Sequence, residues 1–422
     1  MPERCAMPMT VPHDDLISRR FFLRAWALPP KTEVTVGTAA PDRHGACWQA
    51  EATYRTTAAG ALDLSAQPAL TGRFRGVDPA GPIWSLRPRP DHTPAFFEAP
   101  EAGVTLTVRL SAGERVLEET TVRRLTHSPD LHETPVREDG LYGSLFSPAP
   151  GTDLRGACLC LGGSEGGLYS PVAALLASEG FLVLNLAYFG VPDSGLPENL
   201  INLPLEYFGQ AAAWLRARPE VAGRRVGVTG ASKGAEAALL VGATFPQDIG
   251  AVAAFAPSGL VFEGIDRAGT FPPGPPMSSW SFRGQPWPYL PYHTDWAAFF
   301  AAGPQPMTPV HHRAARQASA AQIAAATIPA ERVAGPVLLV SGGEDQVWHA
   351  AELAEVAQRR REAAGRPSRH LTHPHAGHHL SLPGLPTYIH GLWTPGGEEQ
   401  ANAHLQFQAW EAQLETLAAI WA

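Results

Sequence analysis

The sequence predicts two domains: an all-β sandwich, then an α/β domain built on a mostly parallel, doubly wound sheet. Three observations predict it. The chain has 422 residues, which is long for one ordinary domain. Its first third shows short segments that alternate with period two, typical of half-buried strands. Beyond residue 150 or so, apolar strands alternate with helical segments, which indicates a parallel sheet covered by helices.

The N-terminal domain is expected over residues 13–145, after a disordered start at 1–12. Its strands are predicted at Glu33–Gly37, Trp48–Arg55, Val104–Leu110 and Arg115–Arg123. The last two flank the turn sequence Ser-Ala-Gly-Glu and indicate a hairpin. Short strands, frequent turns and no convincing helix favour an immunoglobulin-like β-sandwich.

A Pro-rich linker is expected at 146–153, followed by a catalytic domain over 154–422. Further strands are predicted at Ala157–Leu161, Phe181–Ala187, Arg225–Thr229, Ala251–Phe255, Gly335–Ser341 and from Arg369. Helices are predicted at Pro171–Ser178, Leu203–Ala217, Ala350–Ala363 and Ala401–Ile420. Continuous apolar strands of this kind are typical of sheets buried on both faces.

An irregular insertion interrupts this alternation at about 258–327. It contains the Pro-rich run Phe271–Met277 together with Trp280, Trp287 and Trp296. Long irregular segments in compact domains are usually functional or disordered. We interpret this one as a cap lining an acyl-binding site. The alternative is a structural excursion packed on the sheet.

The central motif is Gly230-Ala231-Ser232-Lys233-Gly234, which fits the G-x-S-x-G nucleophile elbow. An apolar strand precedes it and an Ala/Leu-rich helix follows, as the motif requires. A serine at such a turn has a strained backbone, and glycine two residues to either side avoids a collision. We therefore predict Ser232 as a nucleophile, with a plain tight turn as the alternative.

A serine nucleophile needs a histidine base and an acid that orients the histidine. In α/β-hydrolases the chain order is serine, acid, histidine. The acid is predicted at Glu344 or Asp345, at the end of one strand. The base is predicted at the end of the next strand, at His378 or His379. Both sites follow strand carboxyl ends, where open α/β sheets place their active sites.

The same histidine-rich turn also approaches a metallohydrolase pattern, H-x-H-x-D-H, over His373–His378. Gly377 occupies the aspartate position, and no other ligand set is apparent. We therefore expect no metal here and interpret His373 as structural.

An oxyanion hole is expected from two backbone N–H groups. One belongs to Lys233, the residue after the nucleophile. The second is expected from the glycine-rich run that follows the first sheet strand, at Gly163 or Ser164. This run does not fit G-x-G-x-x-G, so the sequence does not favour a dinucleotide site.

Composition excludes several function classes. The net charge is −8 and no Lys/Arg cluster occurs, which argues against a nucleic-acid partner. No stretch approaches the roughly 18 apolar residues of a membrane span. The four cysteines lack metal or disulfide spacing, and Cys158 and Cys160 are expected to be buried core thiols in a reducing compartment.

The N-terminal segment Ser18–Arg24 resembles a twin-arginine export signal. Its apolar run is short and ends at Pro29-Pro30, so we favour a first strand of a cytoplasmic protein. Export is the alternative. The last residues, Leu417–Ala422, differ from a Ser-Lys-Leu peroxisomal signal.

Seven segments of the chain resemble the acyl-CoA thioesterase and bile acid-CoA:amino acid N-acyltransferase family. They are Trp48–Tyr54, Gly60–Ser65, Gly76–Ser85, Gly230–Glu236, Ile328–Leu339, Gly343–Trp348 and Ala376–His378. The resemblance implies an α/β-hydrolase catalytic domain after the sandwich. It also implies Ser232 as nucleophile, Asp345 as orienting acid and His378 as base.

The resemblance also implies a reaction. Thioesterases of this family carry serine in the elbow, whereas its amino-acid-conjugating members carry cysteine, so serine favours hydrolysis of acyl-CoA through an acyl-serine intermediate. The alternatives are acyl transfer to an amino acid, a carboxylesterase or lactonase on the same triad, and a hydrolase-fold protein that only binds. We expect an acyl-CoA substrate, no cofactor, and a chain that could form a homo-oligomer.

Overall fold

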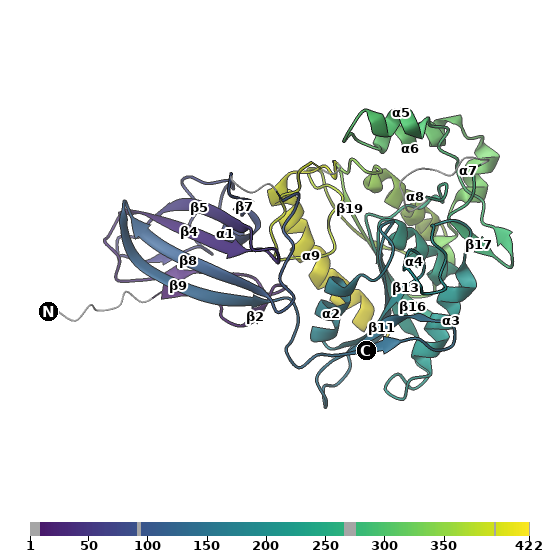
Figure 1. Cartoon of the computed structure of the whole chain (residues 1–422), viewed down its shortest axis with the longest axis horizontal. Helices are drawn as coiled ribbons and strands as arrows, with labels where there is room; N and C mark the ends of the chain where they lie inside the picture. Colours follow the sequence, from purple (N-terminus) through teal and green to yellow (C-terminus); the bar gives the residue numbers. More distant parts are fainter. Residues whose placement is uncertain (1–8, 91–93, 266–275, 392–393, 422) are drawn as a thin grey trace. The chain divides into compact units, whose positions relative to one another are not determined.

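The computed structural model describes residues 9–90, 94–265, 276–391 and 394–421. The chain divides into two compact units (Figure 1). Unit 1 takes residues 1–129 together with 382–392, and unit 2 takes 130–381 together with 393–422.

Unit 1 is a β-sandwich of two sheets. The larger sheet has the order β2-β9-β8-β4-β5-β7, and the smaller has the order β1-β3-β6. The large sheet contains β2 (Asp15–Leu16), β4 (Glu33–Pro41), β5 (Cys47–Arg55), β7 (Arg87–Pro88), β8 (Val104–Ala112) and β9 (Arg115–Leu125). The small sheet contains β1 (Met9–Thr10), β3 (Arg24–Ala25) and β6 (Leu62–Asp63), and one short helix, α1 (Gly81–Trp84), also belongs to this unit.

Alternating burial gives unit 1 its core. Trp48, Ala50, Ala52 and Tyr54 of β5 are buried while the residues between them are partly or fully exposed, as the period-two pattern predicted. The predicted hairpin is present, with β8 and β9 paired antiparallel. Within the segment that resembles an export signal, Phe21 and Leu23 are buried in this unit.

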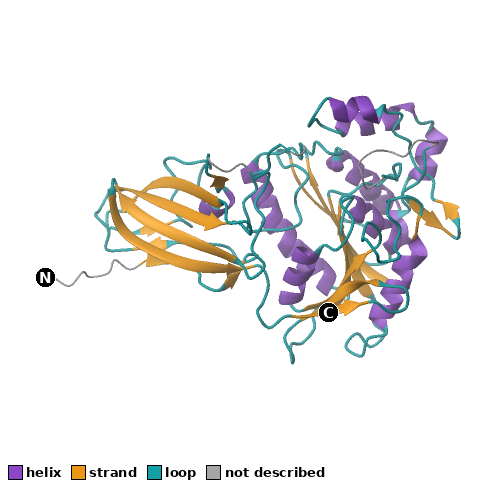
Figure 2. Cartoon of the chain, in the orientation of Figure 1, coloured by secondary structure: helices purple, strands orange, loops and turns teal. Residues whose placement is uncertain are grey.

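Unit 2 is organised around an eight-stranded sheet of order β10-β11-β13-β12-β15-β16-β19-β20 (Figure 2). Its strands are β10 (His132–Val136), β11 (Tyr142–Ser147), β12 (Gly156–Leu161), β13 (Phe181–Ala187), β15 (Val226–Ala231), β16 (Ile249–Phe255), β19 (Val337–Gly342) and β20 (Arg369–His373). The six strands from β13 to β20 are parallel, and β10 and β11 pair antiparallel at one end. This is the predicted α/β-hydrolase class.

Helices cover both faces of this sheet. The long helices are α2 (Ser170–Ser178), α3 (Leu205–Arg216), α4 (Lys233–Thr244), α8 (Ala350–Ala363) and α9 (Glu399–Ala418). Along β16, Val252 and Ala254 pack with α3, α4 and α8, whereas Ala253 and Phe255 pack with α9. Successive strand side chains point to opposite faces, so one strand serves two cores.

The domain boundaries differ from those expected from the sequence. Strands β10 and β11 belong to the sheet of unit 2 rather than to the sandwich, and the segment expected as a linker begins inside β11. Residues 382–392 return to unit 1, where Thr387 N–H donates to the Trp84 carbonyl at 3.1 Å. Met9–Thr10, expected in the disordered start, pairs with β3. Residues 1–8 lie outside the described residues.

The insertion between β16 and β19 forms short helices and a small sheet. The helices are α5 (Trp296–Ala301), α6 (Thr308–Gln317), α7 (Ala320–Ala326) and the 3₁₀ turn η1 (Ala330–Arg332). The small sheet joins β14 (Leu203–Pro204), β17 (Trp280–Phe282) and β18 (Gln285–Pro286).

Buried aromatic residues tie the insertion into unit 2. Trp280 is buried in the main core, and Phe262 and Tyr292 are buried with Trp348 in a second cluster. For these residues, burial favours the structural excursion over an open lining. Most of the Pro-rich run 271–277 lies outside the described residues, and the interpretation as a cap stays a prediction.

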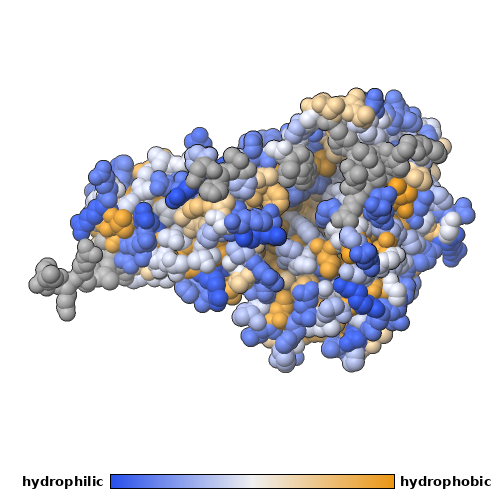
Figure 3. Space-filling model, in the orientation of Figure 1, coloured by the Kyte–Doolittle hydropathy of each residue, from blue (hydrophilic) through white to orange (hydrophobic). Residues whose placement is uncertain are grey.

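The surface of both units is mixed in character. On the face shown in Figure 3, apolar residues are interspersed with polar ones. Across the described ranges, no helix is long and apolar enough to cross a membrane. Cys158 and Cys160 are fully buried on β12, as predicted, and burial raises the pKa of the Cys158 thiol to about 12.

Candidate active site

The elbow is built where β15 meets α4. Ser232 is the N-cap residue of α4 and has φ +55° and ψ −122°. Its N–H donates to the Phe255 carbonyl at 2.9 Å, which holds the turn against β16. A Cβ on Gly230 would lie 2.2 Å from the Gly234 carbonyl oxygen, and one on Gly234 would lie 2.1 Å from that of Gly162. Both glycines of the motif are therefore sterically required.

An acid–histidine pair lies beyond the ends of β19 and β20. Oδ2 of Asp345 is 2.7 Å from Nδ1 of His378, and both residues are buried. Oδ1 of Asp345 accepts from the backbone N–H groups of Val347 and Trp348 at 2.8 and 3.2 Å. The carboxylate is thus held from both sides, and it contacts the imidazole on its Nδ1 side.

The elbow and the pair share one edge of the sheet. β15, β16, β19 and β20 are adjacent and parallel, so Ser232, Asp345 and His378 all follow carboxyl ends at that edge. The ring of Trp348 lies near both His378 and the side chain of Lys233. Its ring centroid is 6.3 Å from that of His378 and 5.9 Å from Nζ of Lys233. Its indole N–H donates to the Ala256 carbonyl at 3.0 Å.

The alternative acid, Glu344, and the other histidines of the turn are not part of this buried pair. Glu344 is exposed and pairs with Nδ1 of the exposed His375 at 2.9 Å. His379 is exposed. His373 Nδ1 accepts from the backbone N–H of His375 at 3.2 Å. Among these candidates, Asp345 and His378 are both buried, and they lie 2.7 Å apart between Oδ2 and Nδ1.

The three oxyanion-hole candidates differ in their distance from the elbow and in whether the backbone N–H already has an acceptor. Lys233 is the first residue of α4, a position whose N–H has no intrahelical acceptor. Gly163 lies against the elbow, since a Cβ on it would be 3.4 Å from Ser232 Cβ. Its N–H donates to Oε1 of Glu165 at 2.8 Å, so a carboxylate occupies this donor. Ser164 is exposed.

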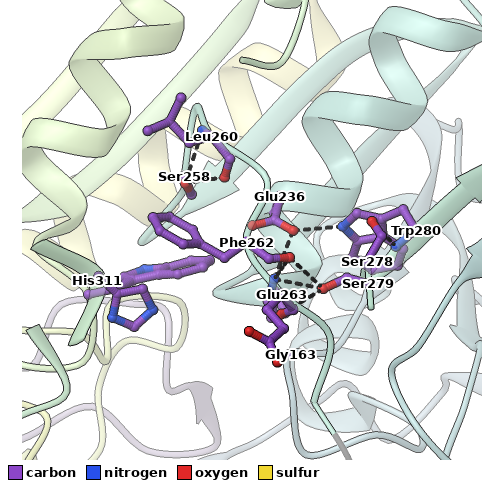
Figure 4. A network of polar contacts seen from close by, with 12 residues as sticks. Gly163, Glu236, Ser258, Leu260, Phe262, Glu263, Ser278, Ser279, Trp280 and His311 are labelled. Atoms are coloured by element: carbon purple, nitrogen blue, oxygen red, sulfur yellow. Dashed lines mark hydrogen bonds and ion pairs between the residues drawn. The ribbon is translucent and has the colours of Figure 1, made fainter. Parts of the chain in front are cut away.

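A buried charged network beneath the elbow was missed by the sequence analysis. Nζ of Lys233 donates to Glu236 Oε1 at 2.9 Å and to Ser279 Oγ at 2.8 Å, and the Trp280 indole N–H donates to the same Glu236 oxygen at 2.7 Å. Figure 4 shows Glu236, Ser279 and Trp280 meeting in this network. Burial lowers the pKa of Lys233 and raises that of Glu236, and their mutual attraction opposes both shifts.

The network links the first turn of α4 to the insertion. Glu236 lies one turn after Lys233, which is the only hint that the sequence offers. The partners on the insertion are more than 40 positions away in the chain, so no local pattern could have predicted them.

Within the part of the chain that the structure describes, one cluster has the residue types and spacing to hold a metal ion. The three-residue group that could hold a cation there is His312, His349 and Glu352, not the histidine-rich turn at 373–378. None of these three was singled out from the sequence.

Comparison with known proteins agrees with this architecture. The family described as BAAT / Acyl-CoA thioester hydrolase C terminal matches residues 203–419, and the Acyl-CoA thioester hydrolase/BAAT N-terminal region matches 19–138. Acyl-coenzyme A thioesterase 5 of Mus musculus is 31% identical over 401 residues, covering 91% of this chain and 89% of that protein. Acyl-coenzyme A thioesterase 1 of Homo sapiens is 30% identical over 404 residues, with 92% and 90% covered.

Solved structures with some likeness include two dienelactone hydrolases. That from Anabaena variabilis is 18% identical with a TM-score of 0.38 and covers 68% of this chain and 99% of its own. The putative enzyme from Klebsiella pneumoniae is 16% identical with a TM-score of 0.41 and covers 68% and 98%. The matches to both family regions and to full-length relatives show that this chain belongs to the acyl-CoA thioester hydrolase and bile acid-CoA:amino acid N-acyltransferase family.

Proposed function

We propose that this protein is a serine-dependent acyl-CoA thioesterase. The observation that carries the proposal is the buried 2.7 Å contact between Asp345 and His378, at the same sheet edge as a serine held at φ +55° in a strand-to-helix turn. A histidine oriented by an acid near a nucleophile elbow is the arrangement that acyl transfer needs. The names of the relatives supply the substrate class, acyl-CoA thioesters.

The reaction would proceed in two halves. His378 takes the proton of the Ser232 hydroxyl while Oγ attacks the thioester carbonyl carbon. The carbon–sulfur bond then breaks, the CoA sulfur takes the proton from the imidazolium, and an acyl-serine ester remains. Water, deprotonated by the same histidine, attacks the ester carbonyl carbon; the bond to Ser232 Oγ breaks, Oγ takes the proton back from the imidazolium, and the free acid leaves. The backbone N–H of Lys233, aided by the positive end of α4, would stabilise the oxyanion in both halves.

The test is thiol release from a panel of acyl-CoAs, from short to long chains and including bile acyl groups. Wild type should release CoA and free acid, whereas Ser232→Ala should lose at least about a thousandfold in turnover while keeping its folded circular-dichroism spectrum. The matched control is Ser65→Ala, which removes an exposed serine hydroxyl of unit 1, outside the candidate site. A Ser232→Ala variant with near-normal turnover would show that the nucleophile is wrong.

Adding glycine or taurine separates hydrolysis from acyl transfer. CoA release that depends on the amine and yields an amide would identify an N-acyltransferase in spite of the serine. Turnover of aryl esters but of no acyl-CoA would identify a carboxylesterase instead.

Compartment and assembly stay predictions. The names of two relatives specify a mitochondrial and a peroxisomal protein, and they concern those proteins alone. The cytoplasmic location and the homo-oligomer expected from the sequence are therefore still to be tested.

A further inference from the structure

We infer that unit 2 binds a divalent transition-metal cation of the zinc type at His312, His349 and Glu352, away from the acid–histidine pair. One ligand atom from each residue lies within 4.8 Å of those from the other two. Nε2 of His312 and Nε2 of His349 are 3.5 and 3.9 Å from the same Glu352 oxygen, Oε2. The two imidazole rings are 3.8 Å apart between centroids.

These distances suit a small cation. Zinc binds imidazole nitrogen and carboxylate oxygen at about 2.0–2.2 Å, so two ligands of a tetrahedral site lie about 3.3 Å apart. The two nitrogen–oxygen distances observed, 3.5 and 3.9 Å, are near that spacing, and all three ligand atoms lie within 4.8 Å of one another, so side-chain rotation can bring them onto one ion. Two imidazoles and one carboxylate also match the preference of zinc, cobalt and nickel better than that of magnesium or calcium, which prefer oxygen ligands.

Two helices, α6 and α8, position the three residues. His349 is the N-cap of α8 and Glu352 lies in its first turn, so the two share one face of the helix. His312 comes from α6, whose start is bonded to the loop that carries the acid: the Met307 N–H donates to the Gln346 carbonyl at 2.9 Å.

Packing fixes the spacing of the two helices. Val310 and Ala314 of α6 are buried in one cluster with Leu353 of α8. A rigid site of this kind loses little conformational freedom when a ligand binds.

The neighbouring His311 is not part of the site. Its Nε2 is 3.3 Å from the Tyr292 hydroxyl, and its Nδ1 is 3.1 Å from the Met307 carbonyl, so both ring nitrogens have partners. By contrast, Nδ1 of His349 is buried without a hydrogen-bond partner. Nε2 of His349 faces Glu352 Oε2 and is therefore the ring nitrogen that would bind the ion. A cation here would join α6 of the insertion to α8, directly after the Asp345 loop.

The experiment is titration of the full-length, chelator-treated protein with Zn²⁺ by calorimetry, and with Co²⁺ by visible absorption. We expect one Zn²⁺ per chain, a d–d spectrum typical of nitrogen and oxygen ligands, and a rise in melting temperature with Zn²⁺ concentration. Neither readout depends on catalytic activity.

The half-buried His312 and the exposed Glu352 allow mild variants. His312→Gln and Glu352→Gln should each weaken Zn²⁺ binding by at least about tenfold. The matched control is His375→Gln, which alters another surface histidine next to a glutamate and should leave the affinity unchanged. Absence of stoichiometric binding in wild type would overturn the proposal. So would variants that bind as tightly as wild type, or a control that weakens equally.

Discussion

At the scale of single residues, two adjacent carboxylates have opposite environments. Asp345 is buried and bonded to His378, whereas Glu344 is exposed and pairs with His375. An exposed ion pair contributes little to the free energy of folding, because solvent screens it. A buried carboxylate that holds a catalytic imidazole in one tautomer has, by contrast, a large effect on turnover.

The two carboxylates therefore predict unequal effects on turnover. Asp345→Asn should lower kcat about a thousandfold or more, because the amide can no longer orient His378 and stabilise its protonated form. Glu344→Gln should change kcat by less than about twofold. Steady-state CoA release on both variants checks this, and a reversed order would assign the acid to Glu344.

A second carboxylate, that of Glu165, lies at a candidate oxyanion donor. Oε1 of Glu165 accepts from the Gly163 N–H, which is one of the two candidates predicted for the second oxyanion donor, the other being Ser164. If the oxyanion takes this N–H, it must displace a like-charged group. Glu165→Ala should then raise kcat/KM about threefold or more, which corresponds to ~0.7 kcal/mol.

The measurement is kcat/KM for one acyl-CoA, with Glu198→Ala, an exposed acidic residue on another loop, as control. Unchanged kcat/KM in Glu165→Ala would mean that Gly163 donates to no oxyanion. A decrease would mean that Glu165 holds the loop in its active form.

At the scale of elements, α4 joins the site to the insertion. Its first turn supplies the oxyanion candidate Lys233, and the same side chain is buried with Glu236, Ser279 and Trp280. A buried ion pair is expensive to desolvate, but removing one partner is more so, since the remaining charge is left uncompensated.

Glu236→Gln should therefore lower the free energy of unfolding by ~3 kcal/mol, although the amide can still accept from Trp280. Urea unfolding followed by circular dichroism measures this. The control is Glu355→Gln, which breaks an exposed pair with Arg359 at 2.8 Å and should change the free energy of unfolding by less than about 0.5 kcal/mol. Equal effects of the two variants would show that burial does not decide the contribution.

At the scale of the whole molecule, stability should depend on pH through histidines in opposite environments. His370 contacts Ser341 Oγ at 2.7 Å and Gln358 Oε1 at 2.8 Å, and burial lowers its pKa. The exposed His375 has its pKa raised by its hydrogen bond to Glu344. A lowered pKa means that the unfolded chain binds the proton more readily, so stability falls as pH drops below the unfolded value of 6.5.

His370→Gln should therefore make the free energy of unfolding fall less steeply between about pH 6.5 and 5, because one fewer group takes up a proton on unfolding. His375→Gln acts in the other direction, because its raised pKa adds stability at low pH that is lost as pH rises through the folded value. Urea unfolding at several pH values checks both. An unchanged slope in His370→Gln would mean that this histidine titrates alike in both states.

Local patterns were sufficient for most elements of this fold. Period-two alternation predicted β4, β5, β8 and β9, and apolar runs separated by helical segments predicted the core strands of the parallel sheet, because both signals arise between neighbours in the chain. The strand–turn–helix around Ser232 could be predicted for the same reason, since its glycines avoid clashes within a few residues.

Only the tertiary structure decided the features that join distant segments. It assigned β10 and β11 to the sheet of unit 2 and residues 382–392 to unit 1, although their local patterns fit either. It showed that Asp345 is buried and Glu344 exposed. Burial depends on the packed core and cannot be read from two adjacent positions in the sequence. It also brought together Lys233 with Trp348, Glu236 with Trp280, and His312 with His349. Such contacts depend on how helices and loops pack, and no spacing along the chain encodes that.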